Sequence, residues 1–485
     1  MKQITDLEPK IVWKYFHEVT QVPRPSKKEG QMIRYLEAFA AKHGLSAKTD
    51  KTGNVLISKP ATPGYEKLQT VILQSHMDMV CEKNSDVVHD FEKDPIETVI
   101  DGEWLRAKGT TLGADNGIGV AAQLAILASG DIAHGPIECL FTIDEETGLT
   151  GAAAIEEGFM TGRILLNLDS EDEGQLFIGC AGGKGTVATF IYEPLPAPSG
   201  MQYFRITATG LNGGHSGCDI HKGLGNANKL LARFLYSLHR NFHFALSAWE
   251  GGNLHNAIAR EGYAVIGLEG EDREKVRVFL NHFIIDVENE LKQVDPGLRI
   301  TMETVDQPET CLSDELTVRL INSVLACPHG VIGMSREIEG LVETSTNLAS
   351  IKMKVDNRII IGTSQRSSIG SAKDAVADQV AATFLLAGAK VEQGEGYPGW
   401  APNPDSKILK VAQETYRALF QKEPEIMAIH AGLECGLFLE KYPYLDMISF
   451  GPTLRDVHSP NERIEIDTVG LWWKHLLELL KNIPA

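Results

Sequence analysis

The chain has 485 residues, of which 43% are hydrophobic and 23% charged, so it can form a sizeable core in roughly two or three domains. Its formal net charge of −19 argues against a general nucleic-acid binder, because such a protein needs a basic face to displace counterions from phosphates. No apolar run approaches the ~20 residues of a membrane span, and the N-terminus lacks an apolar signal core. Seven scattered cysteines without a Cys-x-x-Cys pair predict reduced thiols, and thus a soluble, cytoplasmic protein with no membrane partner.

Helical and strand-like segments alternate over the first 180 residues. A helix is expected over 27–43, with Ser26 as its N-cap and Gly44 at its C-terminus. A buried helix is expected over 117–129, and strands over 54–60, 70–76, 136–143 and 163–170. The last three strands are nearly continuous apolar runs, which is typical of a sheet covered by helices on both faces. The pattern predicts an α/β fold.

The pattern changes at about residue 184, where alternating, half-exposed strands begin. A long helix over roughly 225–243 and further strand–helix alternation follow, up to about residue 390. After a segment rich in proline and glycine come a predicted helix over 407–420, an apolar strand over 445–452 and a last helix ending near residue 483. The simplest organisation is one α/β domain made of residues 1–183 and 395–485, with a mixed sheet between helices and an α+β domain of residues 184–394 inserted into it. No internal repeat is evident.

Histidine and acidic side chains follow the predicted strands at the points where the strands end. They are His76 and Asp78, Asp115 before the buried helix, Glu145 and Glu146, Asp169, and His458 late in the chain. In open α/β sheets the functional groups gather beyond the carboxyl ends of the strands, so these side chains are expected at one edge. So much negative charge in one place favours a bound cation. Imidazole and carboxylate ligands suit zinc, cobalt or manganese.

Asp115 is central in this set and is the predicted bridge between two metal ions. His76 and Asp169 would complete the ligands of one ion, and Glu146 and His458 those of the other. Two transition-metal ions per subunit, of zinc, cobalt or manganese, are therefore the expected cofactors.

Two further carboxylates have predicted roles beside the ions. Asp78 would orient His76 by accepting the N–H of its other ring nitrogen. Adjacent side chains diverge, so Glu145 is left beside Glu146 as a general base. Two ions ~3.5–4 Å apart lower the pKa of a shared water from ~15.7 toward ~7, which lets a carboxylate deprotonate it. Glu145 would then pass the proton to the leaving nitrogen, and the interpretation is metal-assisted hydrolysis of an amide.

Several motifs together resemble the M20 metallopeptidase family, and within it most of all the branch of bacterial aminoacyl-histidine dipeptidases (peptidase D, cytosol non-specific dipeptidase). The motifs are "SHMDMV", "GTTLGADNGIG", "DEETG", "LNLDSEDEG", "GGHSG", "HAGLECG" and "HSP". The resemblance runs from the first helix to the last. It implies a dizinc catalytic domain, an inserted lid domain, a homodimer, and hydrolysis of dipeptides such as carnosine and other Xaa-His peptides. It implies the same five ligands, catalytic roles for Asp78 and Glu145, and a cis bond between Asp115 and Asn116.

The resemblance adds three residues of the lid domain. His215 in "GGHSG" resembles a histidine that polarises the scissile carbonyl, often across the dimer. Asn256 and Arg366 resemble residues that hold the carboxylate end of the substrate, a task that suits the two-pronged donors of an arginine. Arg455 and Asp456 stand before His458 where small residues are expected, which leaves the preference for histidine open.

Three alternatives remain open from the sequence. A related enzyme with the same metals would act on another amide, as an N-acyl amino acid deacylase or a tripeptidase. The residue type at Asp169 favours a peptidase, because a deacylase of this family is expected to have glutamate there. A nucleotide-binding oxidoreductase on a doubly wound sheet lacks its Gly-x-Gly-x-x-Gly motif here. A binding protein without catalysis is disfavoured by the intact Glu145.

Overall fold

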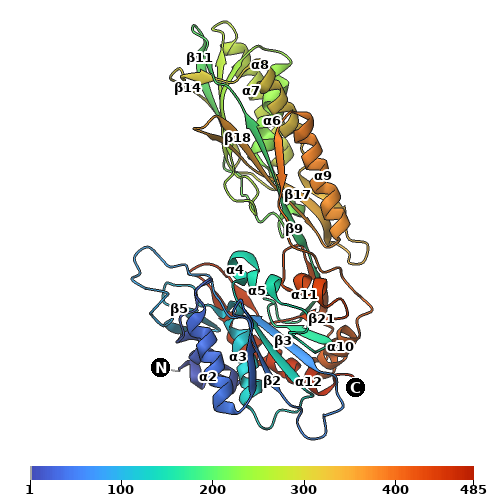
Figure 1. Ribbon diagram of the computed structural model, residues 1–485. Coiled ribbons are helices and arrows are strands. Elements are labelled where there is room, and N and C mark those ends of the chain that lie inside the picture. The colour runs from blue at the N-terminus through green and yellow to red at the C-terminus, as the bar shows by residue number, and fades with distance from the viewer. Residues whose placement is uncertain (1–2) are drawn as a thin grey trace. The chain divides into compact units, whose positions relative to one another are not determined.

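The computed structural model describes residues 3–485, which form two compact units (Figure 1). Unit 1 consists of Met1–Gly179, Trp400–Ala428 and Leu433–Ala485, and unit 2 of Cys180–Gly399 and Ile429–Gly432. The four residues 429–432 therefore return to unit 2, at a place where the sequence pattern predicts no boundary. None of the helices in the described range is long and apolar enough to span a membrane.

An eight-stranded mixed sheet forms the centre of unit 1, in the order β1-β2-β6-β3-β7-β21-β8-β20. The strands β3, β6, β7 and β21 run parallel to their neighbours within this group. The bounds are β1 Ser46–Thr49, β2 Val55–Lys59, β3 Val71–His76, β6 Ile137–Thr142, β7 Ile164–Asn167, β8 Gln175–Cys180, β20 Glu425–Ile429 and β21 Asp446–Ser449. Every residue of β3, β6 and β7 is buried, as their continuous apolar runs predict.

Helices lie on both sides of this sheet (Figure 1). Among them, α2 packs on β1 and β2, α3 on β3, and α10 on β21, while α1 pairs with α3 and α10 with α12. The bounds are η1 Ile4–Asp6, α1 Lys10–Thr20, α2 Gly30–His43, α3 Ala114–Ala128, α4 Glu145–Gly148, α5 Thr150–Ala154, α10 Lys407–Phe420, α11 Cys435–Lys441 and α12 Ile466–Lys481. A second, four-stranded sheet has the order β22-β23-β5-β4, with β4 Thr98–Asp101, β5 Trp104–Ala107, β22 Leu454–Arg455 and β23 Arg463–Glu465.

The prediction that Ser26 caps a helix was wrong. The helix α2 begins at Gly30, and Glu29 occupies its N-cap position. The Ser26 hydroxyl donates to Oδ2 of Asp78 at 2.8 Å, so it is committed to a carboxylate 52 residues away. Gly44 does end the helix in the left-handed conformation, with φ of 66°.

Unit 2 is built on an antiparallel sheet of nine strands, in the order β14-β11-β13-β12-β17-β18-β9-β19, with β16 paired to β17. The four long helices α6, α7, α8 and α9 lie on one side of it (Figure 1) and share one hydrophobic core with the facing strands. The bounds are β9 Gly182–Ile191, β10 Leu195–Pro196, β11 Gln202–Thr209, η2 Ile220–Lys222, α6 Ala227–His239, β12 Ala245–Gly251, β13 Gly262–Leu268, α7 Arg273–Leu291, β14 Arg299–Val305, β15 Thr310–Cys311, α8 Asp314–Ala326, β16 Gly330–Met334, β17 Val342–Lys354, β18 Arg358–Ser367, α9 Gly370–Leu386 and β19 Lys390–Gln393. The short strands β10 and β15 pair separately.

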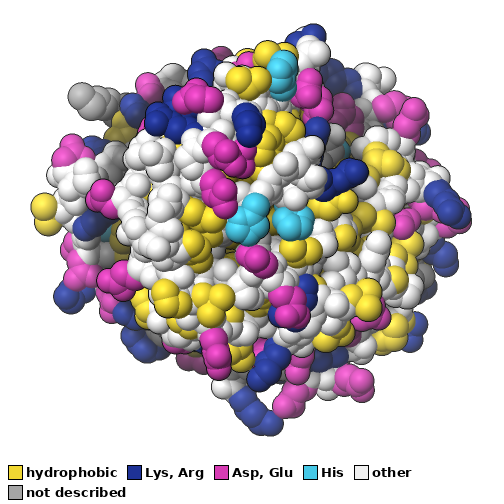
Figure 2. Space-filling model, turned by 90° about the horizontal axis from the view of Figure 1, so that it is seen from above, with side chains coloured by type: hydrophobic (Ala, Val, Ile, Leu, Met, Phe, Trp, Pro, Cys, Tyr) yellow, Lys and Arg dark blue, Asp and Glu magenta, His cyan; other side chains and the backbone are white. Residues whose placement is uncertain are grey.

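The topology of unit 2 repeats itself. The segments β11-α6-β12-β13-α7-β14 form one βαββαβ motif, and β9 with α8-β17-β18-α9-β19 forms a second one, interrupted by the first. Both have the same internal strand order, and the sheet continues from one to the other where β12 pairs with β17. The sequence shows no such repeat, because a repeated topology does not require repeated residues. On the face drawn in Figure 2, basic side chains lie among acidic ones, without a continuous basic surface among the described residues.

Candidate active site

The predicted ligands of the first ion come together at the carboxyl ends of the parallel strands in unit 1. Nε2 of His76, the last residue of β3, lies 3.0 Å from Oδ1 of Asp115 and 3.4 Å from Oδ1 of Asp169. Asp115 lies in the first turn of α3, and Asp169 follows β7. His76 is 1% exposed, and the side chain of Asp169 is 8% exposed. These three groups are close enough together to bind one cation.

The predicted ligands of the second ion form a group that shares Asp115 with the first. Nε2 of His458 lies 3.3 Å from Oδ2 of Asp115 and 2.9 Å from Oε2 of Glu146. Each oxygen of Asp115 therefore faces a different histidine, which is the geometry of a bridging carboxylate. The Asp115–Asn116 peptide bond is cis, as the family resemblance implies. The Asn116 side chain donates to Oδ1 of Asp169, a contact that the sequence pattern did not suggest.

Asp78 connects the end of β3 to the start of α4. Oδ1 of Asp78 lies 3.3 Å from Nδ1 of His76, on the side of the ring that faces away from Asp115. The backbone N–H groups of Glu145 and Glu146 donate to its two oxygens at 3.1 and 3.3 Å. Asp78 thus orients both the histidine and the helical turn that carries the two glutamates.

Carboxylates dominate the electrostatics of this region. Burial opposes a charged imidazole at His76, but Asp169, Asp115 and Asp78 outweigh it and raise its pKa well above the usual range. Hydrogen bonds to Asp115 and Glu146 raise the pKa of His458 to about 11. The pKa values of both histidines are raised by an excess of negative charge, and the same excess favours a cation held between the carboxylates.

The donor set fits a pair of transition-metal ions. It combines two imidazoles with three carboxylates, one of them facing both imidazoles. In addition, Oε1 of Glu146 is buried and accepts no hydrogen bond from the described residues. Burial is also the main cause of the raised pKa of the Glu146 carboxyl group. A buried carboxylate oxygen without a donor indicates that a further positive group belongs there.

Glu145 differs from Glu146 in its surroundings. Its carboxylate lies near His76 and Glu146 but makes no hydrogen bond or ion pair with another described residue. Burial, together with the charges of Asp169 and Glu146, raises the pKa of Glu145 well above its usual range. Such a carboxyl group is suited to take up a proton and give it back.

The three predicted lid residues lie in unit 2. The backbone N–H groups of Gly217 and Cys218 point at Nδ1 of His215, at 3.3 and 3.1 Å, so Nδ1 is an acceptor and Nε2 carries the proton. Burial and the nearby Arg366 lower the pKa of His215 to about 4, which keeps the ring neutral. His215 and the half-buried Asn256 line one pocket of about 530 Å³.

Arg366 is 8% exposed and has no carboxylate partner in the described structure. Its guanidinium donates to the hydroxyl of Tyr397 at 3.0 Å, and its Nε to the hydroxyl of Ser216 at 3.4 Å. His430, in the segment that returns to unit 2, bonds through Nε2 to Ser345 at 2.7 Å. Burial and Arg366 lower the pKa of His430 to about 3. A buried cation with only neutral partners favours an anionic ligand.

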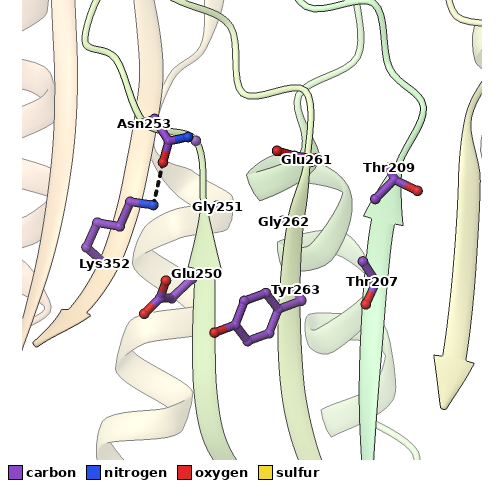
Figure 3. Close-up of a pocket in the computed structure, with 10 residues that line it drawn as sticks. Thr207, Thr209, Glu250, Gly251, Asn253, Glu261, Gly262, Tyr263 and Lys352 are labelled. Carbon is purple, nitrogen blue, oxygen red and sulfur yellow. Dashed lines mark hydrogen bonds between the residues drawn. The ribbon is translucent and has the colours of Figure 1, made fainter.

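A second recess of about 200 Å³ lies on the same sheet, beside the pocket of His215. Figure 3 shows it between β11, β12, β13 and β17, with Lys352 reaching across to Oδ1 of Asn253 at 2.8 Å. Gly252, Asn253 and Glu261 line both hollows, so the two are adjacent. No predicted site residue lines the recess itself.

Arg455 and Asp456, which the sequence marks as unusual, both have partners close by. Arg455 donates to Oδ1 of Asp172 at 2.6 Å, and Asp456 lies 3.1 Å from the guanidinium of Arg463. These contacts hold the segment before His458. His458 itself has a left-handed backbone conformation, with φ of 61°.

A model of peptidase family M20/M25/M40 matches residues 72–482. The chain belongs to this family. It is therefore a peptide-bond hydrolase of a metal-dependent family, and the predicted resemblance is confirmed.

Two relatives share more than 40% of their residues with this chain over essentially its whole length. The cytosol non-specific dipeptidase of Escherichia coli is 43% identical over 488 residues, which covers 100% of both proteins. The crystal structure of an aminoacylhistidine dipeptidase from Vibrio alginolyticus superposes with a TM-score of 0.91 at 45% identity, covering 100% of this chain and 98% of that one. A tripeptidase from Staphylococcus aureus, at 16% identity and a TM-score of 0.57, covers 98% of this chain and 99% of its own and shares the fold. The predicted fold class, a mixed-sheet α/β domain of peptidase type with an inserted α+β domain, is confirmed.

Proposed function

We propose that the protein is a homodimeric dinuclear-zinc dipeptidase, which hydrolyses unblocked dipeptides including Xaa-His peptides such as carnosine. The shared carboxylate of Asp115, placed between His76 and His458, is the observation that carries the proposal. The names of the two full-length relatives, a non-specific dipeptidase and an aminoacylhistidine dipeptidase, support the choice of substrate.

In this proposal unit 1 supplies the ligands. His76 and Asp169 would hold one ion, Glu146 and His458 would hold the other, and Asp115 would be a ligand of both. The ions would supply Lewis acidity, which polarises the substrate carbonyl and lowers the pKa of the attacking water. Asp78 keeps the His76 ring in place from the other side.

Glu145 is the general base and then the general acid. Its carboxylate has no hydrogen-bonding partner among the described residues to restrain it, and its raised pKa suits proton transfer. It takes a proton from the attacking water and gives it to the nitrogen of the leaving amino acid, so the amide bond breaks as a C–O bond forms. The proton count of the residue is unchanged at the end of the cycle.

Unit 2 would bind the other end of the substrate. Nε2–H of His215 is the available donor of a neutral ring, so it is suited to polarise the scissile carbonyl oxygen. Arg366 and Asn256 would hold the terminal carboxylate, Arg366 through its charge and both through N–H donors.

The test measures histidine release from carnosine by chelator-stripped protein, before and after addition of zinc. Zinc is expected to restore activity, and Glu145→Ala is expected to abolish the restored activity while it retains the metal. Glu157→Ala, which removes an exposed carboxylate from the same part of the chain, is the matched control and should stay active. If the protein binds zinc but leaves carnosine intact, the substrate is wrong, and acyl amino acids and tripeptides are tested next. If it neither binds zinc nor cleaves, the proposal is overturned.

A further inference from the structure

Glu462 is a buried carboxylate with an unusual set of partners. It is 2% exposed, and its oxygens accept hydrogen bonds only from backbone N–H groups of a distant segment. Oε2 accepts from Leu112 and Gly113 at 2.7 and 2.9 Å. Oε1 accepts from Ala114 and Asp115 at 2.7 and 3.3 Å. These N–H groups open helix α3, so the carboxylate caps that helix from about 350 residues away in the chain.

The same residue belongs to the loop that carries His458. This loop runs between β22 and β23, and Glu462 lies four residues after the histidine. Glu462 therefore ties the loop of His458 directly to the backbone of Asp115. The side chains of Asp115 and His458 lie 3.3 Å apart and are predicted ligands of the second ion.

Arg24 holds the same segment from the opposite side. It is 1% exposed and donates to the carbonyl oxygens of Met77 and Asp78, at 3.1 and 2.6 Å, and to that of Gly113. It thus ties the loop after His76 to the loop before Asp115. One buried charge of each sign fixes the 112–115 segment, and each joins it to a different ligand-bearing loop.

We propose that Glu462 is a positioning residue for the second metal ion, because it sets the separation of Asp115 and His458. By the same geometry Arg24 positions the first site, where Asp115 meets His76. The inference rests on the proposed two-metal centre. It assigns to Glu462 and Arg24, neither of which is a predicted ligand, the role of holding the ligands in position. Groups that orient metal ligands affect metal affinity by about 10–100-fold when they are altered.

Glu462→Gln is the informative change because it preserves size. Its amide nitrogen cannot accept a hydrogen bond, so two of the four backbone N–H groups lose their partner. The 112–115 segment then relaxes relative to the loop of His458, while the contact between His76 and Asp115, which Arg24 holds, remains. The effect is therefore expected at one ion and not at both.

The experiment titrates chelator-stripped protein with Co²⁺ and follows the absorbance of bound cobalt, with competing chelators to resolve the two affinities. The unaltered protein is expected to bind two ions. Glu462→Gln should bind the first ion with an affinity within about threefold of that of the unaltered protein, and the second ion about 10–100-fold more weakly. Excess metal should restore the activity of the variant. Glu462→Asp keeps the charge but is shorter, and it provides a second variant with the same expected direction should the first fold poorly.

Glu138→Gln is the matched control. Glu138 is also a buried carboxylate bound by backbone N–H groups, those of Thr161 and Gly162, but it lies near the other end of β6. This variant should lose some stability and bind both ions normally. If Glu462→Gln and Glu462→Asp also bind both ions normally, or weaken both ions equally, the positioning role is refuted. If the unaltered protein binds fewer than two ions, the proposed two-metal centre is refuted together with the positioning role. If the unaltered protein binds two ions and cleaves carnosine, the proposed function stands, and normal binding by the Glu462 variants refutes the positioning role alone.

Discussion

The two groups of predicted site residues have opposite electrostatic character. In unit 1, the carboxylates of Asp78, Asp115, Glu146 and Asp169 surround two histidines, and no lysine or arginine forms an ion pair with them among the described residues. In unit 2, Arg366 is buried among hydroxyl groups and histidines, without a carboxylate partner. The first region is short of positive charge and the second is short of negative charge.

The histidines report this difference directly. Neighbouring carboxylates raise the pKa of His76 and His458, whereas burial and Arg366 lower the pKa of His215 and His430. The same side chain is thus biased towards the cation in one unit and held neutral in the other. The ligands proposed above follow this difference: cations for unit 1, and an anion such as the carboxylate end of a peptide for unit 2.

The largest effect is expected from Asp115→Ala in unit 1. The change removes the carboxylate whose two oxygens lie 3.0 Å from Nε2 of His76 and 3.3 Å from Nε2 of His458, so both ions should be lost. Dipeptide hydrolysis is expected to fall by about 10³-fold or more, which corresponds to roughly 4 kcal/mol of transition-state stabilisation. Metal content and kcat/KM are measured together. The control is Asp131→Ala, which removes an exposed carboxylate just beyond the other end of α3; a similar loss there would refute the assignment.

The next largest effect is expected from Arg366→Met in unit 2. Loss of a charge-assisted hydrogen bond worth about 1.5–3 kcal/mol should lower kcat/KM by about 10–100-fold, mainly through KM. Metal content should not change. Arg358→Met is the matched control, because Arg358 lies on the same strand, is exposed and pairs with Asp356. A dipeptide amide, which lacks the terminal carboxylate, should be cleaved equally by Arg366→Met and the unaltered protein; if the variant loses activity on both substrates, the carboxylate role is wrong.

The regular elements were predictable because their signals are local. The predicted helix over 407–420 coincides with α10, and the apolar runs of β3, β6 and β7 are buried as expected. The grouping of the unit 1 residues was also predictable in outline, because parallel strands end at one edge of a sheet. The lid residues were accessible only through the family resemblance, since nothing in their spacing indicates a site, and only His215 and Asn256 line one pocket.

The residues that hold the site together were not predictable. Arg24 and Glu462 are single charges whose partners are backbone groups far away in the chain, and such partners leave no sequence pattern. Ser26 was misread for the same reason, because its hydroxyl bonds to Asp78 instead of a helix terminus. His430 belongs to the quoted "HAGLECG" motif, yet the chain's return to unit 2 at that point has no local signal.

A smaller effect concerns Glu434, a fully buried carboxyl group of unit 1. It accepts hydrogen bonds from Gln74 and Thr142, and burial raises its pKa to about 8. Between its ordinary pKa and about pH 8 the folded chain holds a proton that the unfolded chain releases, so stability falls as pH rises, by at most about 1.4 kcal/mol per pH unit. Glu434→Gln should flatten this slope in urea unfolding of chelator-stripped protein at pH 5 to 8. An unchanged slope would show that the carboxyl group is ionised in the folded state, as in the unfolded chain.

The smallest effect tests the cause of the difference between the two groups of histidines. If the positive charge of Arg366 helps to hold His215 neutral, then Arg366→Met should raise the pKa of His215 from about 4, although burial, the larger cause, continues to lower it. NMR titration of histidine-labelled protein measures this shift, with His215→Asn to assign the resonance. Arg358→Met should leave the titration unchanged. The pKa of His458 should also stay unchanged in both variants, since the carboxylates of its own unit set it. A His215 that titrates identically with and without Arg366 would mean that burial, and not the charge of Arg366, keeps the ring neutral.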